Sequence, residues 1–347
     1  MTYPYRLAFI LILYGLTGCV GDSPQKPPQS GGYYETDEYV IAPVVPCEDA
    51  FALYDSPMKG RLAALSFNPA GTGMGIARSG KIFVVTEDGE QWWELPNNLP
   101  KRSSELLSFV SDSTFYFVTS NRRTLYRSDD LGQTIQEIPS PDATRITALR
   151  FEDAQTGYLL LYRGTDVRTY YFFQTNDGGL TWSDVDLPVS PTQGYFLEVE
   201  ERTALHTAHH LIIRGKPDGD WGVRPLPDGH HATLAFDGRN RGLLAADDHL
   251  YRTNDGGRNW TAGEQMINGV DHLSIGPDGR GSLTGKRYGV VGGDGLLRLG
   301  LLIHHTTDGG ETWSALKTDG ECGTGRTFHP TPSGRLLSIA DQLVMTE

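Results

Sequence analysis

The chain has 347 residues, with 43 acidic and 30 basic side chains and a formal net charge of −13. Nucleic acid is a poor candidate partner for so acidic a chain. Most of the carboxylates are expected on a solvated surface that keeps the protein soluble.

Residues 1–18 have the form of a secretory signal, because a basic residue precedes an apolar run at 7–16 that is too short to span a bilayer. The tetrad LTGC at residues 16–19 resembles the bacterial lipobox, which implies that Cys19 is acylated and becomes the mature N-terminus. Two acyl chains hold a protein stably to a membrane. Val20 in place of Asp resembles lipoproteins sent on to the outer membrane. The alternative is an ordinary cleaved signal with an incidental cysteine.

Residues 19–38 are rich in Pro, Gly, Ser and Gln and lack apolar periodicity, which is typical of a flexible tether. The globular domain is therefore expected at residues 39–347. Short apolar runs punctuated by Gly, Asp and Asn favour strands over helices throughout this domain. The clearest set is 232–236, 242–246 and 249–253, with turns between the strands.

A short phrase recurs in this domain: Ser or Thr, any residue, Asp, Gly, Gly, two variable residues and Trp. It reads TNDGGLTW at 175–182, TNDGGRNW at 253–260 and TTDGGETW at 306–313. Weaker copies read TEDGEQWW at 86–93 and SDDLGQTI at 128–135, and a shortened copy reads KPDGDW at 216–221. The aspartates and tryptophans of the copies are Asp88, Asp130, Asp177, Asp218, Asp255, Asp308, Trp93, Trp182, Trp221, Trp260 and Trp313.

The aspartates are separated by 42, 47, 41, 37 and 53 residues. A period of about 40–50 residues in a strand-rich chain indicates propeller blades. The phrase resembles the Asp box, or bacterial neuraminidase repeat, of sialidases, sortilin-type receptors, some glucan hydrolases and photosystem II assembly factors. The resemblance implies a turn between the third and fourth strands of each blade, on the side away from the substrate face. We expect structural aspartates, because Asp accepts backbone N–H groups in such turns and Gly supplies positive φ.

The 309 residues from 39 to 347 give seven blades of roughly 44 residues each. The chain end LVMTE, at 343–347, matches the lead-in to a box and stops before its aspartate, so the last blade lacks a fourth strand. Residues 39–46 end in an apolar residue and Pro, as several fourth strands do, and are expected to complete that blade. The sequence therefore predicts an all-β fold, a seven-bladed β-propeller closed by an N-terminal strand that leaves no open edge.

With Cys19 assigned to the lipid, Cys47 and Cys322 remain, and two cysteines in an exported protein usually pair. Both lie beside the expected ring closure, so we expect a disulfide between them. Closing a loop of about 275 residues is worth roughly 5 kcal/mol in the chain-entropy account. Two buried free thiols are the alternative.

Ten histidines include adjacent pairs at 209–210, 230–231 and 304–305. Neighbours on a strand point to opposite faces, so such a pair cannot chelate one ion together. No spacing of His, Cys and carboxylates matches a known metal site. The sequence therefore predicts neither a metal nor a cofactor.

The resemblance to sialidases does not extend beyond the boxes, because the Arg-Ile-Pro stretch that sialidases carry is absent. The glucan hydrolases with these boxes use two opposed propellers, and this chain has the length of one. Glu198 and Glu200 are the one carboxylate pair in an expected inner strand that would suit general acid and base catalysis. The alternative for this pair is the frayed end of an exposed strand.

Two features mark candidate partner-binding residues on the face opposite the boxes. Basic residues gather in the expected connections of blades one to three: Lys101, Arg102, Arg122, Arg123, Arg163 and Arg168. The 53-residue interval before Asp308 places an insertion at residues 287–300, and insertions in repeats often form binding loops. Its candidate contacts are Arg287, Tyr288, Asp294 and Arg298, and the alternative is an extended hairpin packed on its own blade.

The sequence predicts a membrane-tethered, non-catalytic propeller that binds a protein or glycan partner in the bacterial cell envelope. Lipid anchoring places it in the outer membrane if the cell has one. The alternative is a sialidase-like or other glycoside hydrolase that uses carboxylates on the propeller face. Photosystem assembly factors match in size, blade number and export, but the likeness rests on the boxes alone and gives no named partner.

Overall fold

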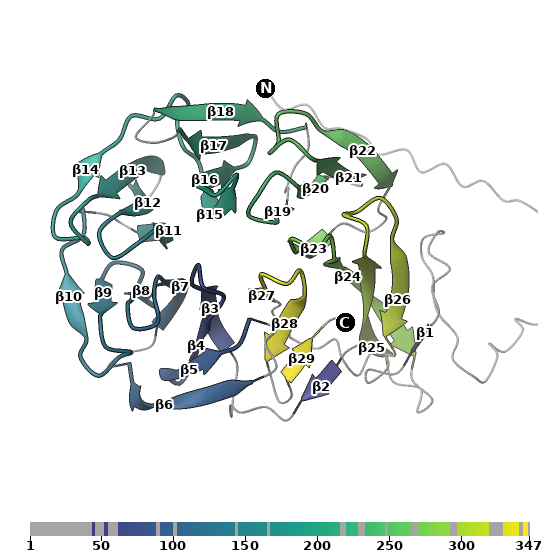
Figure 1. Cartoon of the computed structure of the whole chain (residues 1–347), viewed down its shortest axis with the longest axis horizontal. Coiled ribbons are helices and arrows are strands. Elements are labelled where there is room, and N and C mark those ends of the chain that lie inside the picture. The colour runs from purple at the N-terminus through teal and green to yellow at the C-terminus, as the bar shows by residue number, and fades with distance from the viewer. Residues whose placement is uncertain are drawn as a thin grey trace, which may run out of the picture.

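The computed structural model describes residues 44–45, 52–54, 62–87, 91–99, 103–142, 145–164, 167–215, 220–227, 233–246, 249–265, 270–291, 297–318, 329–339 and 343–345. Regular structure in these residues consists of β-strands, which form seven sheets. The sheets are arranged as a ring, so the protein is an all-β propeller (Figure 1). The described residues contain no helix with the length and apolar character to cross a membrane.

Six sheets are blades built from strands that follow one another in the chain. Blades one and two consist of β3 (Leu62–Phe67), β4 (Gly73–Ala77), β5 (Lys81–Val85), β6 (Trp92–Asn98), then β7 (Ser103–Phe109), β8 (Phe115–Thr119), β9 (Leu125–Ser128) and β10 (Gln136–Ile138). Blades three and four consist of β11 (Arg145–Phe151), β12 (Gly157–Arg163), β13 (Thr169–Thr175), β14 (Ser183–Asp184), then β15 (Gly194–Val199), β16 (Arg202–Thr207), β17 (His210–Arg214) and β18 (Trp221–Pro225). Blades five and six consist of β19 (Thr233–Phe236), β20 (Gly242–Ala246), β21 (His249–Thr253), β22 (Thr261–Gln265), then β23 (Val270–Ile275), β24 (Gly281–Val291), β25 (Leu297–Thr306) and β26 (Ser314–Thr318).

The core lies between neighbouring blades, and the second strand of a blade is buried on both faces. In β12, Leu159 and Leu161 belong to a cluster shared with blade two, whereas Tyr158 and Leu160 belong to a cluster shared with blade four. All four side chains are 0% exposed. Alternation on a strand sends successive residues to opposite faces, so one apolar run serves two interfaces. Each such burial contributes about 1.5–3 kcal/mol, which ties every blade to both neighbours.

The seventh sheet joins the two ends of the chain. It consists of β2 (Ala52–Tyr54), β29 (Leu343–Met345), β28 (Leu336–Ile339) and β27 (His329–Pro330). Leu337 packs with Leu62, Ala77 and Phe83 of blade one, and β27 contacts β23 of blade six, so this sheet lies between those two blades.

The N-terminal strand that pairs with the chain end differs from the predicted one. Residues 52–54 pair antiparallel with β29, while β1 (Val44–Val45), which lies within the predicted segment 39–46, pairs in parallel with β26 of blade six. The prediction for residues 39–46 was therefore wrong. Its basis, an apolar residue followed by Pro, marks where a ladder stops but not which sheet the strand joins.

Residues 287–291 continue β24 and residues 297–300 lie in β25, so the described part of the insertion has the extended form of the hairpin alternative. β24 and β25 pair from Gly281 and Thr306 out to Val291 and Leu297. β23 pairs with β24 only as far as Gly285, so the outer part of this hairpin is a two-stranded ribbon.

Candidate functional site

The four described boxes, in blades two, three, five and six, close their turns in the same way. In blade three, the Thr175 hydroxyl donates to Asp177 Oδ1 (2.7 Å) and accepts the amide of Gly179 (2.9 Å). Asp177 also accepts the amide of Thr181 (2.9 Å), and hydrogen bonds from Thr181 lower the pKa of Asp177 to about 2. Equivalent contacts are made by Asp130, Asp255 and Asp308. These carboxylates therefore bind groups of their own turns.

Box tryptophans pack between blades. Trp182 joins the cluster between blades two and three, and its Nε1 donates to the carbonyl of Pro139 at 2.9 Å. Trp260 and Trp313 pack at the corresponding places before blades five and six.

In blade one, strand pairing places Val85 at the position to which the sequence pattern assigned Thr86. Val85 pairs with Gly73, where blade three pairs Thr175 with Gly157. Trp92 consequently packs against Phe83, with ring centroids 6.3 Å apart, whereas Trp93 is 52% exposed. The assignment of Trp93 to the box was wrong, because the match to the sequence pattern does not fix the register of the strands.

Replacing Thr253 by Val should lower the free energy of unfolding by about 1–3 kcal/mol, because buried hydrogen-bonding groups lose their partner. Thr253 is 2% exposed, and its hydroxyl accepts the amide of Gly257 at 3.0 Å and donates to Asp255 at 2.8 Å. Thr261→Val, at an exposed position of β22, is the matched control. Chemical denaturation would measure both variants, and partner binding should be unchanged. Equal stability of Thr253→Val and wild type would contradict a structural role for the box.

Several predicted residues lie outside the described part of the chain. They are Cys19, Cys47, Asp88, Lys101, Arg102, Asp218, Asp294 and Cys322. The lipid anchor and the Cys47–Cys322 disulfide therefore stay predictions.

A basic cavity of about 250 Å³ opens on the face opposite the boxes. It is lined by Arg122 and Arg168 from the connections between second and third strands, and by Arg145 at the start of β11. Tyr162 and Tyr170 complete its walls with Thr147, Gln193 and Gly194, and none of these lining residues is acidic. We call it the arginine cavity.

Local structure holds the arginine cavity in place. Arg122 adopts a left-handed backbone, with φ 56, and its amide donates to Thr119 O at 2.7 Å. The carbonyl of Arg122 accepts the amide of Ile146 at 2.7 Å, which links blade two to blade three. The guanidinium of Arg168 lies 5.1 Å from the centre of the Tyr162 ring, a cation–π arrangement.

The sequence singled out Arg122 and Arg168 but missed Arg145, Tyr162 and Tyr170. These three lie in strands, near the strand ends, where neither composition nor loop length marks them. Two basic residues of the same connections have other contacts. Arg163 donates to Asp142 O at 2.7 Å and lies over Tyr171, and the amide of Arg123 donates to Asn121 Oδ1 at 3.0 Å.

The candidate residues of the insertion lie on the ribbon of blade six. Arg287 pairs with Leu301, Tyr288 with Gly300, and Arg298 with Val290. The arginine cavity is built from blades two to four, so the structure does not bring these two sets of candidates together.

The two carboxylates considered for catalysis, those of Glu198 and Glu200, form ion pairs with different arginines. Glu198 Oε2 lies 3.0 Å from Arg150 Nη2. Glu200 lies in the turn after β15, with φ 53, and its carboxylate pairs with Arg202, Arg224 and Arg258. Glu200 therefore lies outside the inner strand in which the sequence placed it, and the two carboxylates pair with different arginines.

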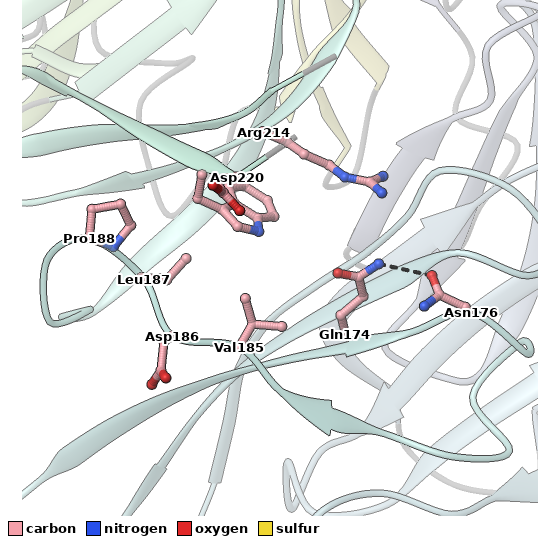
Figure 2. Close-up of a pocket in the computed structure, with 9 residues that line it drawn as sticks. Gln174, Asn176, Val185, Asp186, Leu187, Pro188, Arg214 and Asp220 are labelled. Carbon is pink, nitrogen blue, oxygen red and sulfur yellow. Dashed lines mark hydrogen bonds between the residues drawn. The ribbon is translucent and has the colours of Figure 1, made fainter. Parts of the chain in front are cut away.

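A cavity of about 810 Å³ opens at the rim between blades three and four. It arises where β14 is only two residues long and the box of blade four is shortened. Figure 2 shows Gln174 and Asn176 joined by a hydrogen bond of 2.8 Å, and Arg214 directed away from Leu187. Arg214 pairs with Glu152 at 2.9 Å, and Trp221 packs edge-on against Tyr158, so both serve the interface between the blades. We assign no ligand to this cavity.

Among the described residues, no three His, Cys, Asp or Glu side chains gather as a metal site. The rings of His209 and His210 are 6.5 Å apart on consecutive residues. His206 and His304 are buried, and desolvation lowers the pKa of each to about 4.

No family model and no curated protein matches the chain. Among solved structures, YCF48 bound to D1 peptide is similar over 88% of this chain and 99% of that chain, with TM-score 0.55 and 15% identity. YCF48 from Cyanidioschyzon merolae covers 86% of this chain and 99% of that one, with TM-score 0.58 and 14% identity. The GH74 enzyme of Niastella koreensis matches 84% of this chain, which spans 53% of the enzyme, with TM-score 0.54 and 14% identity. Similarity at these identities shows the fold: this chain is a β-propeller distantly similar to YCF48 and to Asp-box propellers.

Proposed function

We propose that this protein is a lipid-anchored, non-catalytic, seven-bladed propeller that binds an acidic segment of a protein partner in the bacterial cell envelope. Residues 1–18 are the signal, 19–38 the tether and 39–347 the propeller. The seventh sheet is the seventh blade, and β2 supplies its N-terminal strand. Lipid on Cys19 holds the protein to the membrane, the outer one in a cell with two.

The observation that carries the binding function is the arginine cavity. It gathers three guanidinium groups and two phenol rings, with no acidic lining residue, on a chain of net charge −13. Guanidinium presents a planar fork of donors that matches a carboxylate, and Arg and Tyr are enriched among residues that dominate interface energies. The solved complex of YCF48 with D1 peptide supports a peptide as the ligand, because it is a propeller of similar extent.

Site-specific photocrosslinking tests the partner. A photoreactive amino acid at Gln193, which lines the arginine cavity, should capture a protein from native membranes, and mass spectrometry should place the crosslink in an acidic segment. Arg122→Ser/Arg168→Ser should reduce capture about tenfold or more, the loss of roughly 1.4 kcal/mol or more of binding free energy. Arg239→Ser/Arg280→Ser removes the same charge from exposed turns on the box face and should leave capture unchanged. Capture that survives the cavity variant, or a crosslink in a basic segment, would overturn the proposal.

Cys19→Ala should move the protein from the membrane fraction to the soluble fraction, since removal of both acyl chains removes the attachment. Fractionation and intact mass would measure the effect. A wild-type protein without acyl mass, together with a variant that still sediments with membranes, would contradict lipid anchoring and leave the test of the arginine cavity standing.

A further inference from the structure

The inner strands of blades one, two and six share a three-residue ending. It reads LSF at 65–67 and 107–109, and LSI at 273–275. The serine of each copy links its strand to the next inner strand: Ser66 Oγ accepts the amide of Phe109 at 3.0 Å, and Ser108 Oγ accepts the amide of Phe151 at 2.8 Å. Ser274 Oγ donates to Thr331 O at 3.5 Å. A serine at this place therefore has a structural role in the repeat.

Blades three, four and five depart from this ending. They read LRF at 149–151, LEV at 197–199 and LAF at 234–236. The serine is replaced by Arg150, Glu198 and Ala235, on three consecutive inner strands. Arg150 Nη2 lies 3.0 Å from Glu198 Oε2, and Arg150 Nε donates to Thr203 Oγ1 at 3.2 Å. One sector of the ring thus carries an ion pair where the repeat would place a serine.

The ion pair stands at the junction of two cavities on the box face. A central cavity of about 580 Å³ is bounded by turns between first and second strands, among them Asn68 to Gly71. A cavity of about 390 Å³ adjoins it between blades three and four. Arg150, Glu152, Glu198 and Pro69 belong to both linings. We call the two together the recess.

Charge in the smaller cavity is balanced, with three arginines and three glutamates: Arg150, Arg202, Arg214, Glu152, Glu198 and Glu201. Arg214 Nη1 lies 2.9 Å from Glu152 Oε2, and Thr203 donates to the same carboxylate. A strongly charged ligand would have to break such a pair without net compensation. A guanidinium has five donors and a carboxylate about four acceptor sites, so paired groups can still bind hydroxyls.

The walls of the central cavity combine aromatic and proline side chains with polar groups. Phe67 and Phe236 are partly exposed, Tyr195 is 39% exposed, and Pro277 and Pro332 lie at the rim. Aromatic and other apolar side chains beside placed polar groups are found in ligand pockets of this size. Aromatic faces suit the C–H faces of a sugar ring, and adjacent donors and acceptors suit its hydroxyls. We propose that the recess binds one or two neutral sugar units of a glycan, at a site distinct from the arginine cavity.

Placing serine, the residue of blades one, two and six, at positions 150 and 198 tests this proposal. Arg150→Ser/Glu198→Ser places the repeat's own residue at both positions, so the variant should fold with a near-wild-type thermal midpoint. The probes are cellobiose, maltose and N,N′-diacetylchitobiose, titrated by calorimetry and by saturation-transfer NMR. Wild type should bind at least one with a Kd of about 1 mM or tighter, and the double variant should bind it about tenfold more weakly or worse. Arg150→Lys, which keeps the charge and loses the fork, should also weaken binding.

Three results would overturn the proposal. The first is that none of the three sugars binds wild type, and the second is equal binding by wild type and the double variant. The third is loss of sugar binding in Arg122→Ser/Arg168→Ser, which would place the sugar in the arginine cavity. That variant should bind sugar normally while losing the crosslinked partner, so failure here and failure of the proposed function are distinguishable.

Discussion

Lowering the pH from 7 to 4 is expected to reduce the free energy of unfolding by several kcal/mol. Burial lowers the pKa of His206, His304 and His329 from 6.5 to about 4. His206 is 4% exposed, and neither of its ring nitrogens meets a hydrogen-bond partner among the described residues. Its protonation in the folded state would bury an unpaired charge, which is why the neutral form is favoured.

Stability falls with falling pH because the unfolded state binds protons at these histidines at a higher pH than the folded state does. As the pH falls below about 6.5, the histidines of the unfolded chain become protonated while those of the folded chain stay neutral. The free energy of unfolding therefore declines until about pH 4. Each pKa unit is worth about 1.4 kcal/mol, so a shift from 6.5 to about 4 gives about 3 kcal/mol per histidine. The box aspartates act in a lower window. The pKa of Asp177 is lowered to about 2, so its contribution is present above the ordinary 3.8 and lost towards pH 2.

Denaturant titrations at half-unit pH steps separate the two windows. His206→Phe keeps a ring against Tyr195, whose ring centroid lies 4.7 Å away, and removes the titrating group. Its stability should decline less than that of wild type between pH 6.5 and 4, and equally below pH 4. Parallel curves for wild type and His206→Phe across the upper window would contradict the assignment.

Gly178→Ala is expected to destabilise the protein by about 3–5 kcal/mol. Gly178 has φ 74, a left-handed conformation that costs other residues about 1–2 kcal/mol. A Cβ there would lie 2.7 Å from Ala154 O and against Arg127 Nη1. Arg127 Nη1 donates to Ala154 O at 3.2 Å and to Gly178 O at 3.4 Å. The substitution would therefore break the hydrogen bonds that join blade two to the box of blade three.

Blade two provides a natural comparison for this position. Leu131 occupies the place of Gly178 in the box of blade two, with φ 54. Blade one has Val84 where blade two has Arg127, as the pairing with Met74 and Tyr116 shows. The turn of blade two therefore accommodates the side chain of Leu131, because the neighbouring blade has Val84 and not an arginine at the position of Arg127.

A double-mutant cycle tests this explanation. Arg127→Val/Gly178→Ala should be more stable than the sum of the single effects predicts, by about 1–3 kcal/mol, because the residue that clashes is gone. Thermal and denaturant unfolding would measure the four proteins. Strict additivity would mean that the left-handed backbone alone accounts for the cost at Gly178.

The sequence by itself determined the class of fold and many of its strands. Boxes at intervals of 37–53 residues indicated a propeller, and the residues predicted as strands at 242–246 and 249–253 are β20 and β21. These features depend on turn chemistry and side-chain alternation, which act between residues close together in the chain. For the candidate site, the sequence pointed to Arg122 and Arg168 because basic residues in connections stand out against an acidic chain.

Tertiary structure decided which distant strands pair and which side chains line the arginine cavity. Residues 39–46 and 52–54 have similar local preferences for a strand, and only the ring determines that 52–54 pair with β29. Strand register in blade one determined that Trp92, and not Trp93, packs against the blade. Arg145 and Tyr170 meet Arg122 only because the ring sets the first strand of one blade beside the connections of its neighbours. The free energy of pairing between distant segments depends on which strand edges are still unpaired when the other blades have assembled. No local pattern in the chain encodes which edges those are.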